Sequence, residues 1–102
     1  MEQQQGDKEE IPEQKEKDST RKKRLQAFGS AVRRCREDLG LSQEKLAEKA
    51  GVHRTYVGGV ERGEQNVSLA NILNLADALD LSASELMERY EAELQVIEKF
   101  GG

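Results

Sequence analysis

Two arginines and one threonine recur at helical spacing between residues 54 and 62. At 100° per residue, Arg54, Thr55 and Arg62 share one helix face with two residues that have no side chain, Gly58 and Gly59. A guanidinium group can donate two hydrogen bonds to O6 and N7 of guanine, and a threonine can donate, accept or place its methyl group against thymine. This face therefore carries groups that suit the recognition of base edges in DNA.

The two adjacent glycines each cost about 1 kcal/mol relative to alanine in a helix interior, so a compensating contact is expected. The helix backbone could approach DNA or the preceding helix closely, or the glycines could only relieve crowding between helices. Arg54, at the helix start, suits a base contact, with a solvated surface arginine as the alternative. Arg62, at the far end, is better placed for a phosphate.

Two short helices joined by a tight turn must position this face. Ser42 is a good N-cap for the first helix, and Gly51 suits the left-handed residue that ends it. The second helix spans about residues 54–62, with Val57 and Val60 opposite the polar face and directed at the core. This helix, turn and helix is the layout of a helix-turn-helix DNA reader.

Three further helices are expected around this pair, which makes the chain all-α. The first covers about residues 24–39, the next about 69–79, and the last begins after Ser82, where Glu85 completes a capping box. In the helices expected at about residues 24–39 and 69–79, the apolar residues predicted to face the core are Leu25, Phe28, Val32, Cys35, Leu39, Leu69, Ile72, Leu73, Ala76 and Leu79. Cys35 is therefore interpreted as a small core residue and not as a nucleophile or ligand.

An apolar stripe continues along the last helix through Leu86, Tyr90, Leu94, Ile97 and Phe100. It extends beyond what the core of five short helices needs. The part from Tyr90 to Phe100 could fold back on its own domain or pack against a second copy of the chain. We therefore expect a domain at residues 24–88 and a helical extension at 89–102 that serves dimerisation.

The N-terminal segment, residues 1–23, is rich in Glu, Gln and Lys and contains Ile11 as its one large apolar residue after Met1. It cannot bury enough surface to offset its chain entropy, so it is predicted to be a disordered charged tail. A basic run, Arg21 to Arg24, stands directly before the fold. It is either a solvated helix entry or an arm that contacts phosphates without sequence preference.

Composition limits the function classes further. The chain has 102 residues and a net charge of −4, but residues 25–66 carry +1 and residues 67–102 carry −5, so a local basic face is compatible with the total. One cysteine excludes an internal disulfide and suits the cytoplasm. No apolar run predicts a membrane span or a signal peptide. Neither a catalytic constellation nor metal-ligand spacing is present, so we expect no enzyme, no cofactor and no metal.

The segment from about Leu25 to Met87 is similar to the phage repressor/Cro-type helix-turn-helix family, also called the xenobiotic-response-element family. The matching segments are LSQEKLAEKAGV (41–52), ERG (61–63) and NVSLANILNLADALDLSASELM (66–87). Within the family, HRTYVGGVERGEQN (53–66) resembles the recognition region of restriction–modification controller proteins. The resemblance implies a five-helix, repressor-like domain from bacteria or phage that binds a double-stranded DNA operator as a homodimer and regulates transcription, often as a repressor.

Carried over by position, the resemblance assigns roles to individual residues. Arg54 and Thr55 would contact bases, Tyr56 the backbone or an adjacent base, and Gln43, Gln65 and Asn66 phosphates. Gly58, Gly59 and Arg62 join the predicted DNA-binding residues through their positions on the helix. Arg36 and Glu61 would form a partly buried structural ion pair. His53 departs from the small capping residue that the family prefers, and it could add a phosphate contact or have no role. The alternative function is an antitoxin or protein-interaction module.

Overall fold

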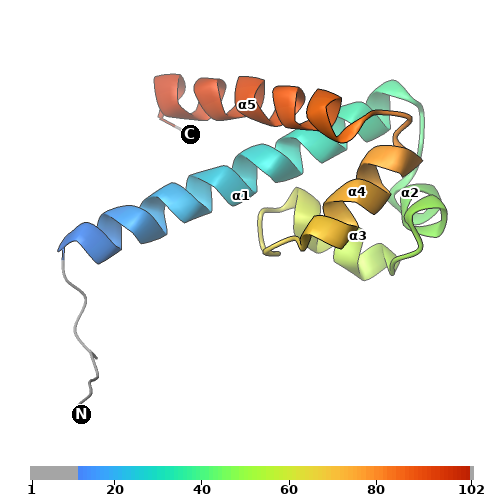
Figure 1. Cartoon of the computed structure of the whole chain (residues 1–102), viewed down its shortest axis with the longest axis horizontal. Coiled ribbons are helices and arrows are strands. Elements are labelled where there is room, and N and C mark those ends of the chain that lie inside the picture. The colour runs from blue at the N-terminus through green and yellow to red at the C-terminus, as the bar shows by residue number, and fades with distance from the viewer. Residues whose placement is uncertain (1–11, 102) are drawn as a thin grey trace, which may run out of the picture.

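The structure is a computed structural model that describes residues 12–101, which form five helices and no strand in that range (Figure 1). The helices are α1 (Pro12–Asp38), α2 (Gln43–Ala50), α3 (Arg54–Glu61), α4 (Leu69–Ala78) and α5 (Ala83–Phe100). The predicted all-α, five-helix fold is therefore confirmed. No helix in the described part of the chain is long and apolar enough to cross a membrane.

Serine caps fix where three of the helices begin. The Ser42, Ser68 and Ser82 side chains accept hydrogen bonds from backbone amides three residues later. Ser82 and Glu85 form the predicted capping box. Gly51 adopts the left-handed conformation (φ 74°) and ends α2, so that the chain turns directly into α3.

The core lies where α2, α3 and α4 pack beneath the C-terminal half of α1, while α5 runs back along α1 in the opposite direction (Figure 1). Its largest fully buried side chains come from all five helices: Val32, Leu46, Val57, Val60, Leu75 and Leu86. Burying each such side chain stabilises the fold by roughly 1.5–3 kcal/mol, so α3 is held mainly through its two valines. Cys35 is 4% exposed, as expected for a small core residue.

Helix α1 begins at Pro12, so it includes residues 12–23, which were predicted to be disordered. That prediction was wrong for these residues because adding turns to an existing helix costs far less than nucleating one. Glu, Lys, Gln and Arg are good helix formers, and proline is favoured at the first helical position. The rest of the predicted tail, residues 1–11, lies outside the described residues.

Three leucines predicted for the core are exposed instead. Leu69 is 70% exposed, Leu73 43% and Leu39 44%. On α4 the buried positions are Leu75, Ala76 and Ala78, with Leu79 just after the helix, so the inner face is rotated away from Leu69 and Leu73.

On α5 the apolar stripe becomes more exposed towards its end. Tyr90 packs against the core, Leu94 and Ile97 are half-buried, and Phe100 is 75% exposed. The start of the stripe therefore folds on its own domain, and its end remains accessible.

Candidate nucleic-acid interface

The first turn of α3 presents its side chains to solvent. Arg54 and Thr55 are exposed, whereas Val57 and Val60 on the opposite face are 0% and 1% exposed. No hydrogen bond or ion pair joins the Arg54 side chain to another described residue. The predicted division of the helix into a core face and an outward face is therefore present, with Arg54 available to an external acceptor.

His53 occupies the N-cap position of α3 but does not cap it with its side chain. Its backbone is extended (φ −80°, ψ 149°), and no side-chain hydrogen bond to the first turn is formed. The imidazole is exposed beside Arg54. The amides at the start of α3 thus have no partner from this side chain, and such amides favour an anion at the helix start.

The predicted ion pair between α1 and α3 is present and bidentate. Arg36 donates from Nε to Oε2 of Glu61 at 2.6 Å and from Nη2 to Oε1 at 3.0 Å. A third donor, Nη1, bonds the Leu41 carbonyl at 2.8 Å. The two side chains are 12% and 4% exposed. Hydrogen bonding to Glu61 raises the pKa of Arg36 further, so the guanidinium stays charged at any physiological pH.

Gln43, predicted as a phosphate contact, also belongs to this network. Its Nε2 donates to Oε1 of Glu61 at 2.9 Å. A carboxamide nitrogen carries two N–H groups, so one donor is used and the second can reach outward. The residue therefore links the start of α2 to the end of α3 and sets the distance between the two helices that a DNA duplex would meet.

Gly29 on α1 lies against the backbone of α3, a close contact that the sequence did not predict. A Cβ placed there would lie 2.3 Å from the Val60 carbonyl oxygen and 2.7 Å from that of Glu61. These are backbone atoms, so no side-chain movement would relieve the clash. The signal for this contact was a glycine within a long amphipathic helix, which costs about 1 kcal/mol unless something requires it.

Gly58 and Gly59 lie beneath polar side chains and not against another helix backbone. The nearest atoms to a Cβ at Gly58 are Nη1 of Arg62 (3.1 Å) and Oε1 of Gln43 (3.8 Å), and at Gly59 they belong to Gln65 (3.1 Å). Crowding between helices therefore does not explain these glycines. Three long polar side chains, those of Arg62, Gln43 and Gln65, cover this strip of backbone instead.

Arg62 pairs with Glu64 in the loop after α3. Nε and Nη2 of the arginine approach Oε2 and Oε1 of the carboxylate, each at 3.1 Å, and both side chains are more than half exposed. Hydrogen bonding to Arg62 lowers the pKa of Glu64, so the carboxylate is ionised at neutral pH. A phosphate at Arg62 would therefore compete with this internal anion. Asn66, in the same loop, is exposed.

Tyr56 connects the outward face to α4. Its hydroxyl accepts a hydrogen bond from Nδ2 of Asn71 at 3.1 Å, and its ring packs against the core. The hydroxyl still has its own proton to donate to an outside acceptor. Asn71 was not singled out from the sequence, because nothing in its local pattern indicates a partner fifteen residues away.

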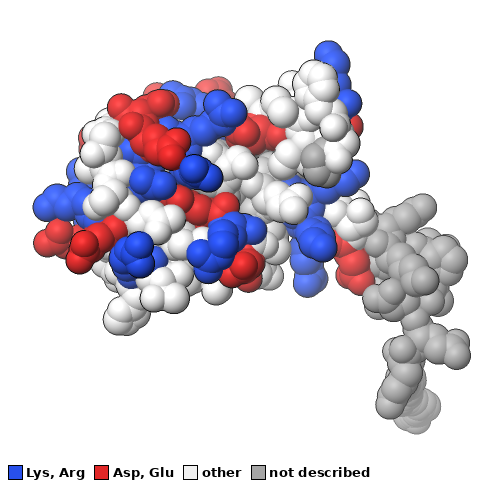
Figure 2. All heavy atoms as spheres, turned by 180° about the vertical axis from the view of Figure 1, so that it is seen from behind, with Lys and Arg blue, Asp and Glu red and all other residues white. Residues whose placement is uncertain are grey.

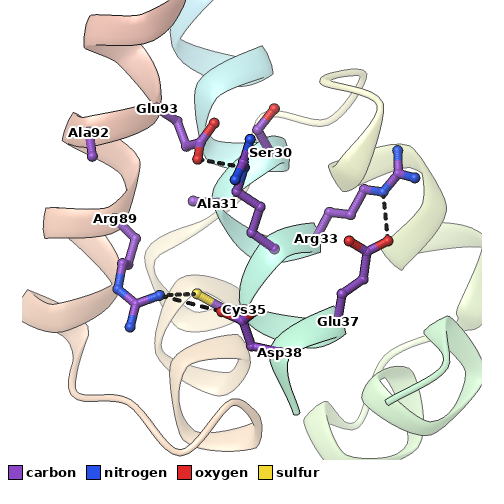
Figure 3. A pocket seen from close by; sticks show the side chains of 10 residues that line it. Ser30, Ala31, Arg33, Cys35, Glu37, Asp38, Arg89, Ala92 and Glu93 are labelled. Atoms are coloured by element: carbon purple, nitrogen blue, oxygen red, sulfur yellow. Dashed lines mark hydrogen bonds and ion pairs between the residues drawn. The ribbon is translucent and has the colours of Figure 1, made fainter. Parts of the chain in front are cut away.

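A hollow of about 650 Å³ lies between α1 and α5, away from α3 (Figure 3). The arginines that line it are already paired: Arg33 with Glu37 (3.1 Å) and Arg34 with Glu93 (2.8 Å), while Arg89 donates to Sγ of Cys35 (3.5 Å). Burial raises the pKa of the Cys35 thiol, which therefore stays protonated. Nothing here forms a catalytic constellation, and the described residues contain no cluster that could hold a metal ion.

Comparisons with known proteins agree with this geometry. Residues 32–86 match the helix-turn-helix family model. The control protein C.SmaI of Serratia marcescens is 52% identical over 58 residues, which cover 57% of this chain and 69% of that protein. The crystal structure of the restriction–modification controller protein C.AhdI from Aeromonas hydrophila is 58% identical, with a TM-score of 0.60, over 61% of this chain and 94% of that one.

A third similar structure contains DNA. It is the restriction–modification controller protein C.Esp1396I, as a tetramer in complex with its natural 35 base-pair operator. That protein is 26% identical, with a TM-score of 0.67, over 71% of this chain and 95% of the other. All three relatives are thus named as control or controller proteins.

Proposed function

This chain belongs to the helix-turn-helix family, in the group of the restriction–modification controller proteins, and we propose that it controls the transcription of restriction–modification genes by binding an operator in double-stranded DNA. Its own gene is among the expected targets. The operator would lie in the bacterial cytoplasm, which also suits a chain with a single reduced cysteine.

The observation that carries this proposal is the exposed Arg54 and Thr55 pair at the start of a helix whose opposite face is fully buried. A helix held in this way can enter the major groove with its first turn against base edges. Arg54 suits a guanine and Thr55 a neighbouring thymine or other base. Gly58 and Gly59 add no side chain of their own to this face, where the side chains of Arg62, Gln43 and Gln65 cover their backbone.

Phosphate contacts would frame this helix on both sides. Gln43 at the start of α2, and Arg62, Gln65 and Asn66 after α3, would donate to the two strands that border the groove. His53 and the Tyr56 hydroxyl are further donors near the start of α3. These contacts fix the register of the protein on the duplex and carry little sequence information.

We propose that two copies bind together, with equivalent α3 helices about 34 Å apart, one per half-site. Exposed apolar side chains on two helices support this: Leu69 and Leu73 on α4, and Met87, Val96 and Phe100 on α5. A contiguous patch of such side chains is typical of surfaces that bind another protein. A second copy related by a two-fold axis would bury these side chains. Because each copy uses the same surface in a two-fold interface, no unpaired surface would remain for further copies to add to.

Selection of bound fragments from random DNA tests the proposal, because it should enrich a motif with two-fold symmetry. Arg54→Ala should then weaken binding to that motif by about 1–3 kcal/mol and relax the base preference at one position in each half-site. Arg33→Ala is the matched control, since it removes an exposed arginine from α1 and should leave binding unchanged. The proposal fails if no motif is enriched, or if Arg54→Ala binds as the unchanged protein does.

A second candidate function, a module that binds a different protein, is favoured by the same exposed apolar residues. The two are separated by the association state of the purified chain in analytical ultracentrifugation. A dimer supports the operator-binding proposal. A stable monomer that binds no selected DNA motif would favour the interaction module.

A further inference from the structure

We propose that the N-terminal part of α1, residues 17–24, is a helical arm that contacts DNA phosphates outside the sequence read by α3. The inference rests on the proposed function and adds a second contact surface to it. It concerns the basic run that the helix-turn-helix motif itself does not use, Arg21, Lys22, Lys23 and Arg24.

The first argument is the location of the arm. Where α1 passes the end of α3, Gly29 meets the carbonyl oxygens of Val60 and Glu61, and Gln26 lies within about 3 Å of the Cβ position of Gly63. Gly63 starts the loop whose residues 65 and 66 are the proposed phosphate contacts. The arm therefore leaves the bundle beside this loop, and Figure 1 shows α1 continuing well past α3 and α4.

The second argument is the direction of the side chains. Residues three and four apart share a helix face, so the face of α1 that carries Gly29 and Gln26 continues to Lys22, with Lys23 beside it. Figure 2 shows Lys and Arg side chains on the part of α1 that extends beyond the bundle. The face that meets the loop after α3 thus becomes basic where it leaves the protein.

The third argument is the charge that the rest of the domain can offer to DNA. Five of its six arginines pair with a carboxylate of the chain itself: Arg33, Arg34, Arg36, Arg62 and Arg89. Lys45 pairs with Glu48. In residues 25–66, this leaves Arg54 and Lys49 as the basic side chains that no ion pair joins to another described residue.

The arm differs from the rest of the domain in how its positive charge is balanced. Residues 17–24 carry five basic side chains and one acidic one, Asp18, a net charge of +4. No ion pair joins a basic side chain of this segment to another side chain of residues 17–101. In a chain with a net charge of −4, the arm is the strongest concentration of positive charge that no ion pair within residues 17–101 balances. DNA, as a dense line of phosphates, is the polyanion that such a segment suits.

The dimensions agree with a few phosphates per arm. At 1.5 Å per residue, residues 17–24 span about 12 Å. Phosphates along one strand are spaced by about 3.4 Å of helix axis, so an arm lying along the backbone would cover about three or four of them. In a two-fold dimer each copy would place its arm on the outer flank of its own half-site.

The test compares Lys22→Gln/Lys23→Gln with a control that also loses two positive charges, Arg33→Gln/Arg34→Gln. Both arginines are exposed on α1 and already pair with carboxylates of the chain, Arg33 with Glu37 and Arg34 with Glu93. Glutamine keeps the helix propensity of lysine, and circular dichroism confirms that helix content is unchanged. Affinity for the selected motif is then measured from 50 to 200 mM salt.

Loss of two phosphate contacts lowers the slope of log affinity against log salt by about 1.8 in magnitude. The affinity ratio of unchanged protein to arm variant should therefore be about 12 times larger at 50 mM than at 200 mM salt. The control variant should follow the unchanged protein. On a duplex trimmed to the outer edges of the motif, the arm variant and the unchanged protein should bind equally.

Equal salt slopes for the arm variant and the unchanged protein on the long duplex would overturn the arm while leaving operator binding intact. An arm variant with an altered association state would assign the lysines to an acidic protein surface, and would overturn it as well. If the unchanged protein enriches no motif, the proposed function fails and the arm fails with it.

Discussion

Replacing Arg36 by methionine should destabilise the protein severely, because it leaves the Glu61 carboxylate buried without its main partner. That carboxylate is 4% exposed and would keep one protein hydrogen bond of the three it now accepts, from Nε2 of Gln43. The Leu41 carbonyl would lose its donor too. Removing one member of a buried pair costs about 3–5 kcal/mol. For a domain of this size that lowers Tm by about 12–40 °C.

Urea unfolding followed by circular dichroism at fixed protein concentration measures this change, since association would add to the apparent stability. Arg33→Met is the control. It removes an exposed arginine of the same helix whose pair with Glu37 is 64% and 52% exposed, and such a pair contributes at most about 1 kcal/mol.

The double substitution Arg36→Met/Glu61→Leu decides whether a stranded charge is the cause. It removes both charges and should recover most of the lost stability, because apolar residues of similar volume often replace a buried pair at little cost. If the double variant lost as much free energy of unfolding as the two single variants lose together, this reasoning would be refuted. So would a cost below about 1 kcal/mol for Arg36→Met alone.

Three further substitutions should act in different directions. Gly29→Ala should destabilise the fold by about 1–3 kcal/mol, because its Cβ would meet the Val60 carbonyl at 2.3 Å, and urea unfolding measures the loss. Gly58→Ala should instead stabilise the fold by up to about 1 kcal/mol, since the atoms nearest its Cβ are the far ends of the flexible Arg62 and Gln43 side chains, and should weaken operator binding. If Gly29→Ala and Gly58→Ala changed the free energy of unfolding in the same direction, the environments assigned to the two glycines would be wrong. Glu64→Gln should free Arg62 for a phosphate, raising operator affinity by roughly threefold or more and steepening the salt slope by about 0.9. An unchanged salt slope in a binding titration would show that Arg62 makes no such contact.

Local chemistry made the start of α2, α4 and α5 predictable. A serine accepts from an amide three residues on, and this needs no information beyond four consecutive residues. The core face of α3 followed from the spacing of Val57 and Val60. The Arg36–Glu61 pair was anticipated from the family resemblance, since no local pattern links residues 25 positions apart.

Other features depend on packing that the sequence does not display. Leu69 and Leu73 fit the apolar face of α4 by spacing, yet the rotation of this helix against α2 and α5 leaves them exposed. The long α1 was missed because residues 12–23 have no core to join. Their helix depends on the folded segment that follows, and a composition rule for isolated chains does not include that support.

Recognition and stability are separated along α3. From Val57 onwards the helix is held by Val57 and Val60 in the core, by the bond of Glu61 to Arg36, and by the close approach of Gly29. Its first two residues, Arg54 and Thr55, are exposed. On the proposed function, substitutions in the first turn would therefore change which bases are preferred at almost no cost in stability, whereas those in the last turn would remove contacts that hold the helix in place. Relatives that keep these last-turn contacts would then differ in operator sequence through the first turn alone.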